Sequence, residues 1–214
     1  MKVITIDGPS AAGKGTIGAS LAKRLDCSYL DSGLLYRQFG LWSLEKAINL
    51  EDEALVLTTV SNHLSQLNWD YIQPDVLRQA DISEAASTIS VFHSIRNLAN
   101  QFQRDYASAA SKWVIIDGRD AGTVVFPDAM IKLFITATLC VRAKRRYEQL
   151  IGLGYSANLS EVEADILRRD LRDQTRSVAP LKPAEDAYIV DTSEEAVDQS
   201  IDRISKYLEK YLVT

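Results

Sequence analysis

The basic side chains with the clearest chemical meaning lie in groups whose spacing suits phosphate binding. Lys14 belongs to a glycine-rich stretch that directly follows the apolar run 3–6 and precedes a segment of helical periodicity. Glycines let the backbone wrap around a phosphate, so that successive N–H groups, the helix N-terminus and the lysine all point at the anion. We therefore predict a P-loop that binds a nucleoside triphosphate. Its residues are Gly8, Pro9, Ser10, Ala11, Ala12, Gly13, Lys14, Gly15 and Thr16.

The residue after the lysine departs from the common form of this motif. A Ser or Thr usually stands there and ligates Mg²⁺, whereas this chain has Gly15. Magnesium is therefore expected to be held mostly by the nucleotide, by water and by other side chains. The order Lys14-Gly15-Thr16 resembles nucleoside monophosphate kinases rather than GTPases or motor ATPases. A chance glycine-rich turn is the alternative, and the strand–loop–helix order argues against it.

A second basic group lies on one face of a predicted helix. Arg169, Arg172, Asp173 and Arg176 are spaced at i, i+3, i+4 and i+7. A solvated surface with i,i+4 ion pairs such as Arg169–Asp173 is the simpler interpretation. However, only one carboxylate accompanies the guanidinium groups, and a phosphate would complete their neutralisation.

A third basic group, Arg142, Arg145 and Arg146, repeats this spacing after the apolar run 131–135. We expect at least one of these residues to bind phosphate or nucleotide, and we assign Arg142 and Arg145 to ATP. Arginines that face a P-loop suit phosphoryl transfer, because its catalysis consists mainly of positioning and of neutralising charge.

Short apolar, β-branched runs alternate with helical segments along the chain. This alternation predicts an α/β fold, a five-stranded parallel sheet flanked by helices. In such sheets ligands bind beyond the carboxyl ends of the strands. Polar or small residues, including the P-loop and Asp117–Asp120, follow the first four runs there. The five runs are 3–6, 28–30, 113–116, 131–135 and 188–190.

We expect one P-loop kinase domain, residues 1–214, in which two stretches fit the sheet poorly. The first, about 37–96, reads as an inserted subdomain with helical stretches and one short candidate strand, Leu67–Ile72. The second, about 151–180, reads as a helical lid with hinge glycines. The remaining core is 1–36, 97–150 and 181–214, closed by an amphipathic helix over 194–212. The second helical stretch of the insert has its apolar residues at Ile82, Ala85, Ala86 and Ile89.

Composition limits the partners and the compartment. A net charge of −5 argues against a nucleic-acid polymer or an anionic membrane as the main partner. Without a leader or an apolar stretch of membrane-spanning length, the chain is expected to be cytoplasmic. Cys27 and Cys140 are predicted to be small buried thiols rather than a disulfide, and His63 and His93 to have surface or boundary roles. A monomer is expected, because a domain that closes around two substrates gains little from a large fixed interface.

Four segments together resemble bacterial-type cytidylate kinases. They are Ile4–Ser10 with the P-loop, Leu30-Asp-Ser-Gly33 with Tyr36-Arg37, Asp117-Gly-Arg-Asp-Ala-Gly-Thr-Val-Val-Phe-Pro-Asp128, and Arg169–Leu181. The resemblance covers essentially the whole chain, and the 117–128 segment is far more specific than a P-loop. It implies an ATP-dependent transfer of phosphate to CMP or dCMP. One departure is that residues 66–80 are shorter than the small sheet that the family usually carries there.

The resemblance also implies which residues surround the monophosphate. They are Ser32, Arg37, Ser87, Arg96, Arg119, Asp120, Arg169, Asp173 and Arg176, with Ser87 the least secure. Cytosine presents a donor amine and two acceptors, which suit Asp120, Ser87 and Arg96. Uracil inverts this pattern and would leave the groups of the site unpaired. Arg37, Arg119 and Arg169 suit the monophosphate, Asp173 a sugar hydroxyl, and Arg176 the sugar or base.

The expected mechanism is direct in-line transfer without a covalent intermediate. The charge of the transferring group would be held by Lys14, Arg119, Arg169 and Arg172, and Asp117 would contact Mg²⁺ through water. Simpler roles exist for three residues. Ser32 could cap a helix that begins near Leu34, Asp117 could end its strand in a turn, and Arg96 could be a solvated helix residue.

Two other functions compete with this interpretation. A monophosphate kinase of the same fold acting on UMP or AMP would share the P-loop and the lid arginines, but it gives no reason for Asp120 together with Arg96. A regulatory module that binds nucleotide without turnover would keep the fold, but the intact set of arginines argues against it.

Overall fold

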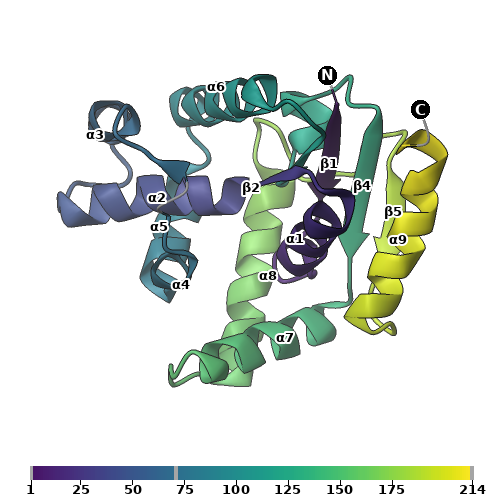
Figure 1. The fold of residues 1–214 in the computed structure, drawn as a ribbon. Helices are drawn as coiled ribbons and strands as arrows, with labels where there is room; N and C mark the ends of the chain where they lie inside the picture. Colours follow the sequence, from purple (N-terminus) through teal and green to yellow (C-terminus); the bar gives the residue numbers. More distant parts are fainter. Residues whose placement is uncertain (1, 70–71, 213–214) are drawn as a thin grey trace. The chain divides into compact units, whose positions relative to one another are not determined.

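The computed structural model describes residues 2–69 and 72–212, which form two compact units (Figure 1). Unit 1 comprises residues 1–30 and 106–214, and unit 2 comprises residues 31–105. The predicted insert, about 37–96, falls within unit 2, and the predicted lid, about 151–180, falls within unit 1. That these two segments move as an insert and a lid stays a prediction.

The sheet has five strands in the order β2-β3-β1-β4-β5, which confirms the predicted α/β architecture. β1 pairs in parallel with β3 and β4, and β4 pairs in parallel with β5. Each strand extends one residue beyond its apolar run, because backbone pairing continues onto a final polar residue. The strands are β1 (Val3–Asp7), β2 (Ser28–Asp31), β3 (Val114–Asp117), β4 (Ile131–Thr136) and β5 (Tyr188–Asp191).

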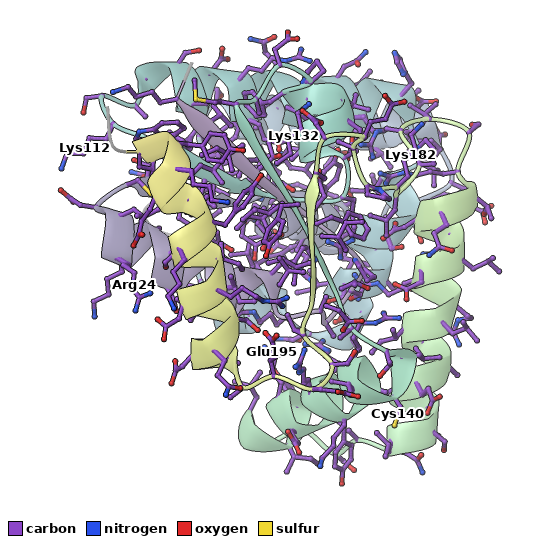
Figure 2. The ribbon with its side chains drawn as sticks, turned by 90° about the vertical axis from the view of Figure 1, so that its right-hand side faces the viewer. Arg24, Lys112, Lys132, Cys140, Lys182 and Glu195 are labelled. Carbon is purple, nitrogen blue, oxygen red and sulfur yellow. The ribbon has the colours of Figure 1, made fainter. Side chains whose placement is uncertain are left out.

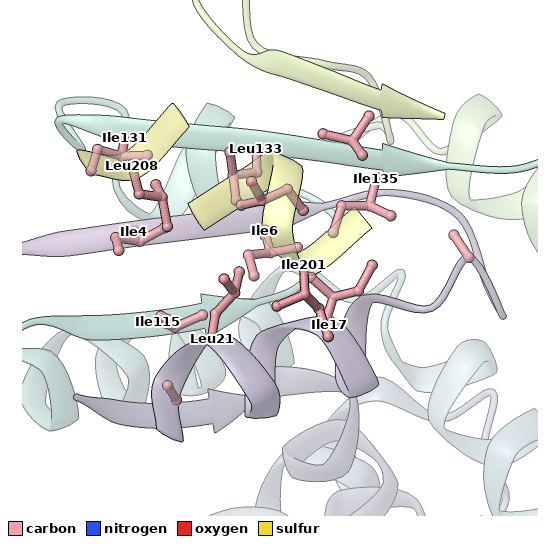
Figure 3. Close-up of a cluster of buried hydrophobic side chains, with 14 residues drawn as sticks. Ile4, Ile6, Ile17, Leu21, Ile115, Ile131, Leu133, Ile135, Ile201 and Leu208 are labelled. Carbon is pink, nitrogen blue, oxygen red and sulfur yellow. The ribbon is translucent and has the colours of Figure 1, made fainter. Parts of the chain in front are cut away.

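Two helices pack on one face of the sheet in unit 1. They are α1 (Lys14–Leu25) and α9 (Val197–Leu212), and α9 begins three residues later than its predicted start at 194. Their apolar side chains meet Ile4 and Ile6 of β1 and Leu133 of β4 in the core shown in Figure 3. Thr5 and Asp7 alternate with these isoleucines, so the period of a strand turns them to the opposite face. Asp7 is therefore a buried carboxylate rather than part of the apolar core.

The remaining elements of unit 1 follow β3 and β4. A π-helical turn, η2 (Ala121–Val125), follows β3, and the helices α7 (Leu139–Gly152) and α8 (Leu159–Thr175) follow β4. α7 and α8 pack through Ala143, Val162 and Ile166. Asn158 caps α8, since its Oδ1 accepts a hydrogen bond from the Ser160 amide at 2.9 Å. α8 lies within the predicted lid, about 151–180, whereas α7 enters it only with its last two residues.

Unit 2 is helical. It contains α2 (Ser32–Glu45), α3 (Glu53–Leu64), α4 (Pro74–Leu77), α5 (Ala80–Ile89) and the first part of α6 (His93–Ala109). The predicted apolar stripe of α5 is confirmed, because all of its members are buried. α2 and α5 approach closely at Gly40, where an added β-carbon would lie 2.9 Å from the Ala86 amide nitrogen. Packing of α2 against α5 thus requires glycine at this position.

One prediction for this region, and one alternative role considered for a residue in it, are wrong. The candidate strand Leu67–Ile72 is not a strand at residues 67–69 and 72, and residues 70 and 71 lie outside the described part. The apolar residues there, such as Trp69, pack onto the helices instead of onto a sheet edge. Asp31 rather than Ser32 caps α2, since its Oδ1 accepts from the Leu34 amide at 3.3 Å. The helix therefore begins two residues before the predicted start.

The predictions for the two cysteines and the two histidines are confirmed for some residues and wrong for another. Cys27 is half-buried. Burial, and to a lesser extent the negative charge of the neighbouring Asp26, raise the pKa of its thiol to about 11. Cys140 is exposed near the start of α7 (Figure 2), so the prediction of a buried thiol is wrong there. The apolar residues beside Cys140 misled that prediction, because α7 turns this position to solvent. His63 is half-buried and His93 exposed, as predicted.

None of the helices in the described part of the chain has both the length and the apolar character needed to cross a membrane.

We expect Gly40→Ala to destabilise unit 2 by about 1–3 kcal/mol, because the added methyl group must displace α5. Urea unfolding followed by tryptophan fluorescence measures this loss, since Trp42 lies on α2 itself. Gly152→Ala, at the end of α7, is the matched control because an added β-carbon there meets nothing within 4 Å. Equal unfolding curves for the parent and Gly40→Ala would contradict the close packing of α2 and α5.

Candidate active site

The glycine-rich loop between β1 and α1 is pressed against the end of β4. Gly8 has φ of 148°, and a β-carbon added there would lie only 1.9 Å from the carbonyl oxygen of Ile135. Gly13 adopts φ of 93°, and Ala11 also has a positive φ, 59°. Glycine alone tolerates the contact with Ile135. The loop therefore has the close approach to its own sheet that the P-loop interpretation requires.

Lys14 begins α1 and is buried. Its Nζ donates to the carbonyl oxygen of Pro9 at 2.9 Å and lies 4.0 Å from Oδ1 of Asp117, at the end of β3. Tyr29 donates its hydroxyl to Oδ2 of the same carboxylate at 3.1 Å. The cation is thus held at the loop, beside the buried carboxylate of Asp117.

The donor set near Asp117 suits a magnesium ion that is carried mainly by a nucleotide. A β-carbon added at Gly15 would lie 3.9 Å from Oδ2 of Asp117, and no hydroxyl side chain stands at that position. Within residues 2–69 and 72–212, no three His, Cys, Asp or Glu side chains are grouped to hold a metal. One carboxylate with phosphate oxygens and water is a common environment for Mg²⁺.

Asp7 is a functional candidate that the sequence analysis missed. Its carboxylate accepts the backbone amides of Ala121 at 2.8 Å and Gly122 at 2.7 Å, in the turn η2. Burial raises the pKa of Asp7 to about 6, although the two amide hydrogen bonds lower it. The residue therefore ties the P-loop strand β1 to the segment that carries Arg119 and Asp120. A lone Asp between an apolar strand and the first P-loop glycine was the available signal.

Four of the predicted monophosphate residues come together in unit 1. Arg119 Nε donates to Oδ2 of Asp173 at 3.1 Å, and Arg176 Nη2 donates to Oδ1 of Asp120 at 3.4 Å. Arg176 also lies 3.9 Å from Asp173. Burial would lower the pKa of Arg119, but the neighbouring carboxylates, chiefly that of Asp173, outweigh burial and raise it. The 117–120 segment and α8 therefore form one cluster of compensated charge.

The predicted face of α8 is only partly buried. Asp173 is buried, whereas Arg169 and Arg172 are half-exposed. The ion pairs of Asp173 are with Arg119 and Arg176. This face of the helix thus turns its acidic side chain, Asp173, inward and leaves Arg169 and Arg172 within reach of solvent.

The three arginines of the third basic group, Arg142, Arg145 and Arg146, each form hydrogen bonds with different partners. The buried Arg142 donates to the carbonyl oxygens of Ala137 at 2.9 Å and Ser10 at 3.1 Å, and it pairs with Asp170 at 2.5 Å. Arg145 donates to Thr192 in the segment after β5. Arg146 donates to Gln149 on the surface of α7. Arg142 and Arg145 therefore lie near the P-loop, since Thr192 itself donates to the Ala12 carbonyl.

Unit 2 carries four more of the predicted monophosphate residues, and the ninth, Arg169, lies on α8 in unit 1. Ser32 and Ser87 are buried, and Arg37 Nε donates to the hydroxyl oxygen of Ser83 at 3.2 Å. Arg96 is only 2% exposed, and its Nη1 donates to the carbonyl oxygen of Ser90 at 3.1 Å. The interpretation of Arg96 as a solvated helix residue is therefore wrong, since α6 buries this guanidinium. Ser83 is a contact that the sequence analysis missed.

Comparison with known proteins agrees on one family. Residues 4–210 match the family model described as "Cytidylate kinase". A cytidylate kinase of Pasteurella multocida is 41% identical over 98% of this chain and 96% of its own length. A cytidylate kinase of Chromobacterium violaceum is 42% identical over 97% and 96%. A shikimate kinase structure from Bacteroides thetaiotaomicron, 13% identical over 97% of this chain and 98% of its own, superposes with a TM-score of 0.50. This last likeness concerns the fold alone.

We expect Asp7→Asn to change how stability depends on pH. The pKa of Asp7 is raised in the folded state, from 3.8 to about 6, so its stabilising proton is present at low pH and lost as the pH rises through 6. The unfolding free energy of the parent should therefore fall by about 3 kcal/mol relative to Asp7→Asn between about pH 4 and about pH 7. Urea unfolding of both proteins across this range measures the difference. Parallel pH curves would show that the folded-state pKa of Asp7 is normal.

Proposed function

Since the chain belongs to the cytidylate kinase family, we propose that it transfers the γ-phosphoryl group of ATP to CMP or dCMP, producing ADP with CDP or dCDP. The observation that carries this proposal is the match of nearly the whole chain to that family, residues 4–210. The pairing of a P-loop with a compensated arginine–aspartate cluster in unit 1 supports it, because a kinase of this kind needs both donor and acceptor residues.

We assign the triphosphate to the P-loop residues Gly8–Thr16, with Lys14 at the outer phosphates. The burial of Lys14 and the approach of its Nζ to a backbone carbonyl support this role, because a nearly desolvated ammonium attracts phosphate strongly. Arg145 is assigned to ATP beside the P-loop. Arg142 is assigned there as well, and its hydrogen bond to the Ser10 carbonyl oxygen of the loop supports this assignment.

The acceptor nucleotide is assigned to the residues that the family resemblance implies. Asp120, Ser87 and Arg96 suit the polar edge of cytosine, because a carboxylate or hydroxyl oxygen accepts from its amine and a guanidinium donates to its ring acceptors. Uracil would leave these groups unpaired, and this cost underlies the expected discrimination. The other assigned residues are Arg37, Arg119 and Arg169 for the phosphate, Asp173 for a sugar hydroxyl, Arg176 for the sugar or base, and Ser32 beside them.

The transfer step is in line. An oxygen of the CMP phosphate attacks the γ-phosphorus of ATP while the bond from that phosphorus to the bridging oxygen breaks, which leaves ADP. Lys14, Arg119, Arg169 and Arg172 hold the charge that spreads over the transferring group. Mg²⁺, which would be held by the nucleotide and through water by Asp117, supplies further charge neutralisation when it is bound. Closure of the insert and the lid would exclude water, which otherwise hydrolyses ATP.

We also propose that the protein acts as a monomer in the cytoplasm, with small-molecule nucleotides as its partners. The net charge of −5 supports the assignment of small-molecule partners, because an extended nucleic acid or an anionic membrane would be repelled.

A coupled assay of ADP production with ATP and Mg²⁺ tests the proposed reaction across CMP, dCMP, UMP and AMP. We expect turnover with CMP or dCMP to exceed that with UMP by about a hundredfold or more, because uracil leaves buried polar groups unpaired. Lys14→Met is the control, and its activity should fall by about two orders of magnitude or more. Equal or greater turnover with UMP would contradict the cytidine assignment, and ATP binding without turnover would indicate a regulatory module.

Asp120→Ala tests the assignment of the acceptor site. Loss of the carboxylate should raise KM for CMP about tenfold or more and change KM for ATP much less, because the interaction is made only with the acceptor. Asp128→Ala is a matched control, since Asp128 ends the same 117–128 segment but is exposed. An equal rise of both KM values in Asp120→Ala would assign this residue to the fold rather than to CMP.

A further inference from the structure

A buried ion pair joins the lid helix to the P-loop through a residue to which no role has been assigned so far. Asp170 of α8 is 5% exposed, and Arg142 of α7 is 7% exposed. Oδ2 of Asp170 lies 2.5 Å from Nη1 of Arg142. Water can solvate neither charge well at this degree of burial, so each charged group is stabilised mainly by its partner.

Both members of this pair also contact the backbone of the same P-loop residue, Ser10. Ser10 donates its amide to Oδ1 of Asp170 at 3.4 Å, and its carbonyl oxygen accepts from Nη1 of Arg142 at 3.1 Å. Arg142 is itself anchored, because its Nε donates to the carbonyl oxygen of Ala137 after β4. The amide and the carbonyl of Ser10 are thus both held by hydrogen bonds, one with α8 and one with α7.

These two hydrogen bonds act next to a strained residue of the loop. Ala11, the next residue, has φ of 59°, a left-handed conformation that L-residues with a β-carbon adopt only when their surroundings impose it. A P-loop binds phosphate through amides that already point at the anion before it arrives. Any contact that holds Ser10 and Ala11 in place therefore favours binding of the triphosphate.

We propose that Asp170 is a positioning residue for ATP, which acts through Arg142 and Ser10 to hold the P-loop in its phosphate-binding conformation. This inference rests on the proposed function only in taking ATP as the ligand of the loop. Asp170 lies three residues before Asp173, which pairs with Arg119 and Arg176 instead. The two buried aspartates of α8 therefore serve different nucleotides, Asp170 the donor and Asp173 the acceptor.

The opposite role would be that of a plug, in which the Asp170 carboxylate competes with phosphate for the loop. The contacts argue against it. The charge of Asp170 is already compensated by Arg142, whereas Lys14 directs its Nζ to the Pro9 carbonyl and Asp117. A competing anion would be expected to draw the lysine that serves the phosphates.

The dissociation constant for ATP, measured by isothermal titration calorimetry without CMP, tests the proposal. We expect Asp170→Ala to raise this constant about tenfold or more and to raise KM for ATP in parallel, while KM for CMP changes less than about threefold. Asp170→Asn keeps the size and one acceptor for Ser10 but loses the charge that Arg142 requires. It should give a smaller rise of the same kind, and it serves as the test if Asp170→Ala does not fold.

Two controls separate positioning from general loss of stability. Asp186→Ala removes the carboxylate partner, 3.0 Å away, of the largely buried Lys132 on β4 (Figure 2), without touching the loop. It should leave both nucleotide constants unchanged. If Asp170 acts through Arg142, adding Asp170→Ala to Arg142→Met should weaken ATP binding little further.

Each outcome decides the matter. Tighter ATP binding in Asp170→Ala would overturn positioning in favour of the plug, and unchanged binding in both Asp170 variants would show that the pair only stabilises the fold. Equal losses for ATP and CMP would also overturn the proposal. A parent protein that binds ATP but does not phosphorylate CMP would refute the proposed reaction, yet the calorimetric test of Asp170 would still stand.

Discussion

Neutralisation of buried charge is the constraint on which unit 1 depends. A charged side chain removed from water is costly unless a partner of opposite sign lies close to it. Asp170 meets this requirement with Arg142, Asp173 with Arg119, and Asp120 with Arg176. One member of each pair lies on or just after α8, and the other lies elsewhere in unit 1. The need to pair these buried charges therefore also determines where α8 packs within the unit.

The same constraint explains how a charged site can exist beside an apolar sheet. One face of β1 contributes isoleucines to the core, while the other carries Asp7, whose carboxylate is held by two backbone amides. Those amides belong to the turn that follows Arg119 and Asp120. The strand that ends at the P-loop therefore also fixes the segment assigned to the acceptor nucleotide, and one short piece of chain links both halves of the proposed reaction.

Local patterns predicted the regular elements well. The five strands coincide with the five apolar β-branched runs, and the apolar stripe of α5 is buried as its spacing predicts. The errors have physical causes. Leu67–Ile72 has the composition of a strand, but its described residues have no strand partner and pack on helices. Cys140 lies among apolar residues, yet the helix that it begins turns it to solvent.

The sequence by itself determined the P-loop, the parallel sheet and the family, because these depend on glycine positions, short-range periodicity and contiguous motifs. The roles of the site residues remain assignments that the tests above address. Only the tertiary structure decided how the charges pair. Asp7 accepts from an amide 114 residues away, whereas Asp170 pairs with Arg142, 28 residues away, and accepts from the amide of Ser10, 160 residues away. No local pattern relates residues at such separations. Side chains that look alike in sequence, such as Asp170 and Asp173, acquire different partners only when the sheet and helices bring distant segments together.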